Sequence, residues 1–301
     1  MNQDNINKLM TQALAIEAEE AKDAGALGFM ARALVQATMP HKKQEKNEFV
    51  RKNGDFKLTM LAPSHIGLPY GSIPRLLMAW ICTEACTTKK RELVLGRSLS
   101  EFMEQIGLVP KGETPTGGRW GNITRLRDQM ARLFSCAISC TYTADEVWAI
   151  QNVTPVTKAN LWWDPKHPNQ MTLFESTITL GEDFFNEVTE HPIPIDLRAL
   201  KALKRSPLAL DIYTWATYKT FKINMGHSKG GSIVPWVLLH NQFGSNYAHN
   251  AQGIRNFKKE FLKELHKVYC LYEGLNVSEE KNGLSIGAGK THIKSLKTSK
   301  S

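Results

Sequence analysis

The stretch between Gly117 and Thr143 constrains the fold of this chain more than any other. Apolar residues spaced three and four apart predict an α-helix over residues 122–134 with one apolar face. These apolar residues are Ile123, Leu126, Met130 and Leu133. The opposite face carries, at the same spacing, Asn122, Arg125, Gln129 and Arg132. The helical period ends at Ser135, and the run 137–142 that follows predicts a strand.

A second segment repeats this pattern towards the C-terminus. An apolar stripe at helical spacing is formed by Ile254, Phe257, Phe261, Leu265 and Val268. The far side of the predicted helix carries Gln252, Arg255, Lys259, Lys263 and His266. Asn250 is placed to cap the start of this helix. The run 270–272 predicts a strand, and the Gly-, Asn- and Ser-rich residues up to Gly283 predict a hairpin.

The same kinds of element precede each polar-faced helix. A short apolar helix that ends at glycine is predicted over 99–107 and again over 235–244, and a longer amphipathic helix over 72–87 and again over 207–221. A repeated order of helix, short helix, basic helix and strand pair is typical of winged helix-turn-helix modules. We therefore predict an α+β protein of two tandem winged-helix (helix-turn-helix) domains with an N-terminal helical extension.

Composition changes along the chain predict the domain boundaries. Residues 1–55 are expected to form an N-terminal helical extension and linker, with a helix over 28–38 and a polar linker over 41–55. The first winged-helix domain is expected over 56–190 and the second over 191–287. The remaining residues, 288–301, hold four lysines and no acidic residue, which predicts a basic disordered tail.

Charge and hydropathy limit the classes of function. The formal net charge is +9 and the pI is about 9.2, which favours an acidic partner such as nucleic acid. No apolar run approaches the ~18 residues of a membrane span, and no basic and apolar leader is recognisable at the start. Five cysteines without a secretory signal predict reduced thiols and a cytoplasmic location, with no membrane partner.

Catalytic and metal-binding motifs find little support. The cysteine pairs 82/86 and 136/140 lack the CxxC spacing of zinc knuckles and lie in apolar segments. The segment Gly289–Thr291 lacks the upstream glycine of a phosphate-binding loop, because Leu284 stands at that position. The His-X-His pair of a DNA-nicking enzyme does not occur in the sequence. We therefore predict no enzymatic activity, no metal and no cofactor.

Four segments together resemble the plasmid-encoded RepA family of replication initiators. They read GFMARALVQAT (28–38), GLPYGSIPRLL (67–77), ELVLGRSLSEF (92–102) and PTGGRWGNITRLRDQ (115–129), and the resemblance extends over about residues 26–290. It implies a bacterial protein that binds repeated double-stranded DNA sites (iterons) at a plasmid origin and promotes duplex opening. It also implies recruitment of host proteins such as the initiator DnaA and the replicative helicase, and homodimers that repress their own promoter in copy control.

We expect both basic helices to contact duplex DNA, because guanidinium and amide groups suit phosphate oxygens and base edges in a major groove. In the second helix the main contacts are expected from Arg255, Lys258, Lys259 and Lys263, with Gln252, Asn256 and Arg255 reading bases. In the first domain the candidates are Arg119, Trp120, Asn122, Thr124, Arg125, Gln129 and Arg132. Two tandem domains would cover about two helical turns of DNA.

Three other interpretations remain open from the sequence. A winged-helix transcriptional regulator without a role in initiation uses the same binding chemistry. A DNA-processing enzyme such as a nickase is a second possibility, although its metal-binding motif is missing. A protein-interaction module, whose basic faces are only solvated, is a third and predicts no DNA binding above background at physiological salt.

Overall fold

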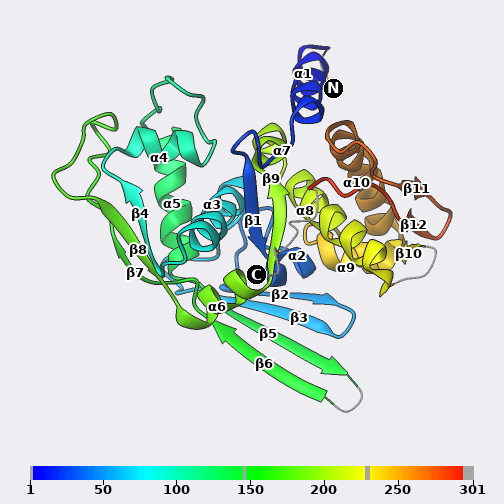
Figure 1. Cartoon of the computed structure of the whole chain (residues 1–301). Coiled ribbons are helices and arrows are strands. Elements are labelled where there is room, and N and C mark those ends of the chain that lie inside the picture. The colour runs from blue at the N-terminus through cyan, green and yellow to red at the C-terminus, as the bar shows by residue number, and fades with distance from the viewer. Residues whose placement is uncertain (1–2, 145–146, 228–230, 294–301) are drawn as a thin grey trace, which may run out of the picture. The chain divides into compact units, whose positions relative to one another are not determined.

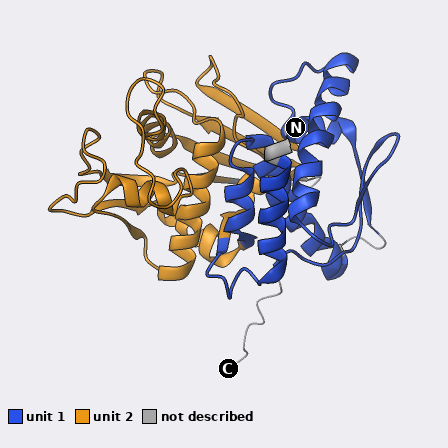
Figure 2. Cartoon of the chain, turned by 90° about the horizontal axis from the view of Figure 1, so that it is seen from above, with its two compact units in different colours: residues 1–28, 193–301 blue, residues 29–192 orange. Residues whose placement is uncertain are grey.

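The computed structural model describes residues 3–144, 147–227 and 231–293 (Figure 1). The chain folds into two compact units (Figure 2). We call residues 29–192 the central unit, and residues 1–28 with 193–301 the terminal unit. Both units mix helices and strands, so the fold class is α+β, as predicted. Residues 29–55 belong to the central unit, whereas the sequence analysis joined them to the N-terminal extension.

Strand β1 (Leu27–Ala31) carries the chain into the central unit, and β9 (Pro192–Asp196) carries it out again; the two strands form a two-stranded sheet. Between them lie α2 (Arg32–Gln36), β2 (Glu48–Asn53), β3 (Phe56–Leu61), α3 (Ser72–Thr88), β4 (Glu92–Gly96), α4 (Leu99–Gln105), α5 (Asn122–Phe134), β5 (Ala137–Ala144), β6 (Val147–Val153), β7 (Val156–Asn160), β8 (Ser176–Leu180) and α6 (Glu182–Glu190). Two sheets result, of order β2-β3-β5-β6 and β4-β8-β7, and every pairing in them is antiparallel.

The region before β3 corrects two predictions. The expected helix over 28–38 is strand β1 followed by the short helix α2, and the expected linker over 41–55 contains β2, which pairs with β3. The alternation in β2 is hard to read from the sequence, because the buried positions are Phe49 and Arg51 and the exposed ones include Val50. A charged residue points inwards and an apolar one outwards, so the usual period of two is masked.

The strand after α5 also corrects the prediction. The sequence placed the strand pair of the first module directly after this helix. Instead β5 and β6 form a hairpin that joins β3 in the four-stranded sheet, whereas β4 pairs with β8, which in turn pairs with β7. The chain therefore inserts residues 137–153 between α5 and the strand pair of its module.

The terminal unit contains α1 (Gln3–Ala18), α7 (Leu197–Leu203), α8 (Pro207–Lys222), the π-helical turn η1 (Ile223–His227), β10 (Ser232–Pro235), α9 (Trp236–Phe243), α10 (Ala251–Leu271), β11 (Val277–Glu279) and β12 (Gly283–Ile286). Its three-stranded sheet has the order β10-β12-β11. The prediction of a strand over 270–272 is wrong, because α10 continues to Leu271, whose buried side chain extends the apolar stripe. The expected cap is confirmed: the N–H of Gly253 donates to Oδ1 of Asn250 at 2.8 Å.

The two units share one order of elements. In the central unit a long helix, a strand, a short helix and a polar-faced helix (α3, β4, α4, α5) precede the strands β7 and β8. In the terminal unit the corresponding elements are α8, β10, α9, α10, β11 and β12. In both sheets the third strand lies between the first and the second. The repetition predicted for the helices thus extends to the pairing of the strands.

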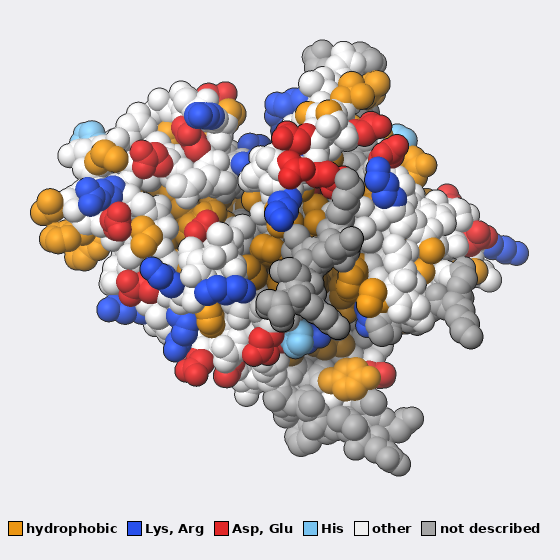
Figure 3. Space-filling model, in the orientation of Figure 1, with side chains coloured by type: hydrophobic (Ala, Val, Ile, Leu, Met, Phe, Trp, Pro, Cys, Tyr) orange, Lys and Arg blue, Asp and Glu red, His pale blue; other side chains and the backbone are white. Residues whose placement is uncertain are grey.

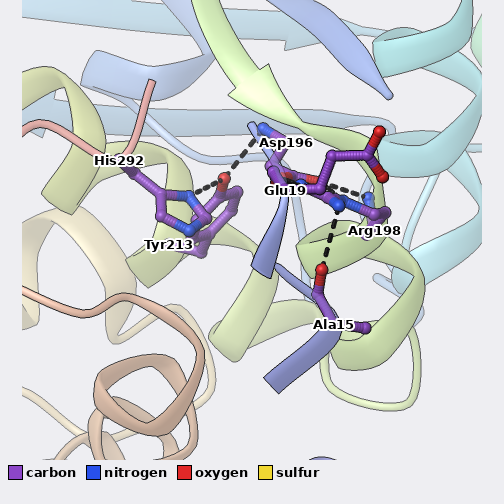
Figure 4. Close-up of polar contacts among 6 residues, drawn as sticks. All are labelled: Ala15, Glu19, Asp196, Arg198, Tyr213 and His292. Carbon is purple, nitrogen blue, oxygen red and sulfur yellow. Dashed lines mark hydrogen bonds and ion pairs between the residues drawn. The ribbon is translucent and has the colours of Figure 1, made fainter. Parts of the chain in front are cut away.

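A polar cluster around the buried Asp196 ties distant segments of the terminal unit together (Figure 4). Arg198 donates to both carboxylate oxygens of Asp196, and also to the carbonyl oxygens of Ala15 and Glu19 at 3.2 and 2.8 Å. The hydrogen bond that Arg198 donates to Asp196 is the largest cause that raises the pKa of Arg198. Since Asp196 is 1% exposed, this ion pair is a fixed anchor for the end of α1.

Candidate nucleic-acid interface

Helix α5 is held in the central unit by the apolar face that the sequence predicted. Ile123, Leu126, Met130 and Leu133 are at most 4% exposed, and α5 packs against α3. The helix begins at Asn122 and ends at Phe134, the predicted bounds. The opposite side of the helix is therefore fixed in orientation, and its exposed residues form the first candidate surface.

Two of the predicted contact residues do not lie on that exposed side. Gln129 is 4% exposed; its Oε1 accepts the N–H of Tyr70 at 2.8 Å, and its Nε2 donates to Asp128 at 2.9 Å. Arg132 donates to Asp128 at 2.8 Å, and its guanidinium lies 5.5 Å from the ring centroid of Tyr70. Both side chains hold the 67–70 turn against α5, so their predicted exposure to a ligand is wrong.

The exposed cations of this surface are Arg119, Arg125 and Arg127. Within the described part of the chain, neither Arg125 nor Arg127 forms an ion pair with a carboxylate. Arg127 was not among the predicted contacts, because it lies outside the i, i+3, i+7 stripe by which the polar face was read. Guanidinium groups without an internal partner are suited to bind phosphate oxygens.

Asn122 and Thr124 have internal roles in the loop before α5. Oδ1 of Asn122 accepts the N–H of Thr116 at 2.7 Å, and the hydroxyl of Thr116 accepts the N–H of Asn122 at 3.2 Å. The Thr124 hydroxyl donates to the carbonyl of Gly118 at 2.7 Å. These bonds close the loop 116–121 against the first turn of α5. Trp120, at the end of this loop, is 81% exposed, and the Arg119 guanidinium lies 5.2 Å from its ring centroid.

Three of the residues predicted to read bases on α10 form one exposed hydrogen-bonded group. Oε1 of Gln252 accepts from the Arg255 guanidinium at 2.7 Å, and Nε2 of Gln252 donates to Oδ1 of Asn256 at 2.9 Å. This arrangement restricts the side chains before any ligand arrives, which lowers the entropy lost on binding. The structure thus brings these three predicted residues together.

The lysines of α10 differ from one another in their surroundings. Nζ of Lys258 lies 2.7 Å from Oε1 of Glu279 on β11 and 4.7 Å from the ring centroid of Trp236. Lys263 pairs with Glu260 at 2.9 Å, and this hydrogen bond is the largest cause that raises its pKa. Lys259 is exposed and has no acidic partner in the described part of the chain. Of the three predicted lysine contacts, Lys259 alone carries a charge not already paired with an acidic residue among the described residues.

Apolar side chains gather at the left edge of the space-filling view, over the segment between β7 and β8 (Figure 3). The segment exposes Met171, Leu173 and Phe174 at 63%, 81% and 59%. It is nevertheless well anchored: Nε1 of Trp163 donates to the carbonyl of Gly96 at 3.1 Å, and the N–H of Thr172 donates to the carbonyl of Arg97. The sequence analysis assigned no role to this segment.

The structure also bears on metal binding and membrane insertion. Cys82, Cys86, Cys136 and Cys140 are buried. Among the described residues no group of three or more His, Cys, Asp or Glu side chains is arranged to hold a metal ion. No helix in the described ranges is long and apolar enough to cross a membrane.

Solved structures with a similar fold are known. Over 86% of this chain and 96% of the other, it is similar to a crystal structure of selenomethionine derivatives of domains 2 and 3 of RctB, with 10% identity and a TM-score of 0.51. A second crystal structure of RctB domains 2–3 matches at 11% identity over 85% of this chain and 97% of that chain, with a TM-score of 0.49. The first match shows a shared fold at very low identity.

The family follows from the sequence profile named "Plasmid encoded RepA protein", which matches residues 68–237. The match covers more than half of the chain and runs from the 67–70 turn through α5 to the start of α9. The chain therefore belongs to the plasmid-encoded RepA family, which confirms the resemblance seen in the sequence. The search of curated proteins found no match.

Proposed function

We propose that this chain is a plasmid replication initiator that binds repeated double-stranded DNA sites at the plasmid origin through two winged-helix modules. The observation that carries the proposal is the shared topology of the two units in a chain of the RepA family. In each unit a strand, a short helix and a polar-faced helix precede a pair of strands. The second strand of that pair (β8 or β12) is hydrogen-bonded to the strand before the short helix (β4 or β10). In such modules the second of the paired helices enters the major groove, a place held here by α5 and α10.

The surfaces of the two helices support different contributions to binding. On α5 the exposed arginines Arg125 and Arg127, together with Arg119, suit phosphates, which set affinity and register. On α10 the group of Gln252, Arg255 and Asn256 suits base edges, since amides pair with adenine and guanidinium with guanine. The proposal therefore assigns positioning mainly to α5 and sequence recognition mainly to α10.

Opening of the duplex, recruitment of DnaA and the replicative helicase, and dimers that repress their own promoter are further parts of this proposal. They rest on the resemblance to the RepA family and on no contact described above. We propose no catalytic step and no cofactor. The regulator without an initiator role shares the binding chemistry, so it is separated from an initiator by plasmid maintenance rather than by affinity.

The test is binding of the whole chain to duplex DNA carrying the origin repeats of its plasmid, with scrambled duplex as control, at about 150 mM salt. We expect a preference of ~10³-fold or more. Arg255→Ala is expected to cost ~1–3 kcal/mol and to relax the sequence preference. Lys267→Ala is the matched control, because Lys267 lies on the same helix and is already paired with Glu264. Equal weak binding to both duplexes would refute sequence-specific recognition.

A second experiment separates the initiator from the regulator. A plasmid that carries the origin but lacks the gene for this chain is introduced into cells that supply the chain from elsewhere. Maintenance of the plasmid that depends on the chain supports initiation. Specific binding without maintenance would show a regulator.

A further inference from the structure

The loop before α5 presents one tryptophan in a fixed position. Trp120 is 81% exposed, and the loop that carries it is closed by the reciprocal hydrogen bonds of Thr116 and Asn122. Gly121 is packed so closely that an added Cβ would lie 2.2 Å from the carbonyl oxygen of Gly117. The indole is therefore held out towards solvent by a structured loop rather than by a mobile one.

The surroundings of the indole indicate the chemistry of its ligand. The Arg119 guanidinium lies 5.2 Å from the ring centroid, and Arg125 and Arg127 are exposed on the helix that follows. A flat aromatic side chain in contact with an arginine, at the start of a helix with further exposed arginines, is a combination that binds nucleobases by stacking and phosphates by charge. Within an intact duplex the faces of the bases are covered by their neighbours, and the grooves offer only base edges. A stacking partner for Trp120 must therefore be a base that has left the paired stack.

We propose that Trp120 stacks on an unpaired DNA base next to the duplex bound by α5. The chain then binds a duplex with an unpaired base more tightly than the same duplex fully paired. This inference rests on the proposed function, because it takes α5 as a helix that contacts duplex DNA. It adds to that function a site for a second form of DNA, with Trp120 as the residue that distinguishes the two forms.

The test uses the whole chain and two origin duplexes of the same sequence, one fully paired and one with a single unpaired base. Affinities are measured by fluorescence anisotropy at about 150 mM salt. We expect the wild-type chain to bind the duplex with the unpaired base about 10-fold more tightly, the range of one base–aromatic stack. Trp120→Ala should abolish this gain, so that the two duplexes bind with equal affinity, whereas Trp120→Phe should retain part of it.

Trp162→Ala is the matched control. Trp162 belongs to the same unit and is 54% exposed, but it lies between β7 and β8, with its ring centroid 5.5 Å from that of Phe174. This variant should keep the full gain. A second readout places 2-aminopurine at the unpaired position, where stacking quenches its fluorescence in the wild-type chain and in Trp162→Ala but not in Trp120→Ala.

The inference is overturned if the wild-type chain shows no gain for the unpaired base, or if the gain persists in Trp120→Ala. A scrambled, fully paired duplex is titrated alongside the two origin duplexes. Failure of the proposed function then looks different, because the fully paired origin duplex and the scrambled duplex would bind equally. If the chain prefers the paired origin duplex over the scrambled duplex but shows no Trp120-dependent gain, the proposed function is supported and the stacking site is refuted.

Discussion

The hydroxyl of Tyr213 lies 2.7 Å from Nδ1 of His292, and the same oxygen accepts the N–H of Asp196 at 2.9 Å (Figure 4). The phenol is therefore placed to donate to Nδ1, and a neutral His292 that accepts at Nδ1 carries its single ring proton on Nε2. That nitrogen is buried, with no hydrogen-bond partner among the described residues. The contact joins α8 to the segment after β12 and closes the polar cluster that also holds α1.

This contact predicts a loss of stability on acidification. Burial is the largest cause that lowers the pKa of His292 below its ordinary 6.5. Asp196, the backbone of Leu271 and Glu20 oppose the shift, and Arg198 adds to it. The imidazole of the unfolded chain is therefore protonated near pH 6.5, whereas that of the folded chain is protonated only at lower pH. The free energy of unfolding thus falls as the pH drops below about 6.5 and rises towards neutrality. Urea unfolding at several pH values between about 5 and 8 measures this slope.

His292→Gln should remove the contribution of this residue to the slope. His65→Gln is the control, because His65 is exposed and forms no ion pair with a carboxylate among the described residues. The control should keep the wild-type slope. An unchanged pH dependence in His292→Gln would mean that other groups carry it.

Two glycines of the same loop are expected to respond differently to alanine. In Gly121→Ala the new Cβ would meet the carbonyl oxygen of Gly117 at 2.2 Å, whereas at Gly117 an added Cβ has nothing within 4 Å. We expect Gly121→Ala to destabilise the central unit by about 1–3 kcal/mol and Gly117→Ala to change stability by less than about 0.5 kcal/mol. Thermal unfolding of both variants checks this, and equal effects would show that the loop adapts freely.

The polar-faced helices were predictable because their evidence is local. Apolar residues three and four apart define α5 and α10, and Asn250 marks the start of α10 where the structure has it. The end of α10 was not predictable in this way. No glycine stops the helix before Gly274, so the apolar run at 270–272 could equally be read as a strand.

The parts of the candidate surface that sequence reasoning missed depend on distant neighbours. Gln129 has a polar side chain on the expected face, but the turn that ends at Tyr70 covers it from 59 residues away. Likewise, the strand after α5 was predicted correctly as a strand but was assigned to the strand pair of the first module. In the structure β5 pairs with β3, which comes from the segment before α3. Periodicity gives the faces of an element; it does not say which other element covers each face.

Arg127 of α5, which forms no ion pair with a carboxylate among the described residues, predicts a specific salt effect. Arg127→Ala should reduce the slope of log affinity against log salt by about one unit, because one phosphate contact and its released counterion are lost. Lys263→Ala should change the slope less, since Glu260 already neutralises Lys263. Titrations of origin duplex at several salt concentrations measure both slopes. Equal slopes for wild type and Arg127→Ala would place α5 away from the DNA backbone.

The thiols provide a test of the fold that needs no ligand. Burial raises the pKa of Cys86 and Cys140 to about 11 and that of Cys136 to about 12, and Cys82 is shifted in the same direction. Cys270, on the exposed side of α10, is the accessible thiol. A chromogenic disulfide reagent at about pH 8 should therefore modify one thiol quickly and the other four only in denaturant, because both access and thiolate formation are blocked. Cys270→Ser should remove the fast phase alone; a fast phase that survives in this variant would mean that one of the four packed cysteines is open to solvent.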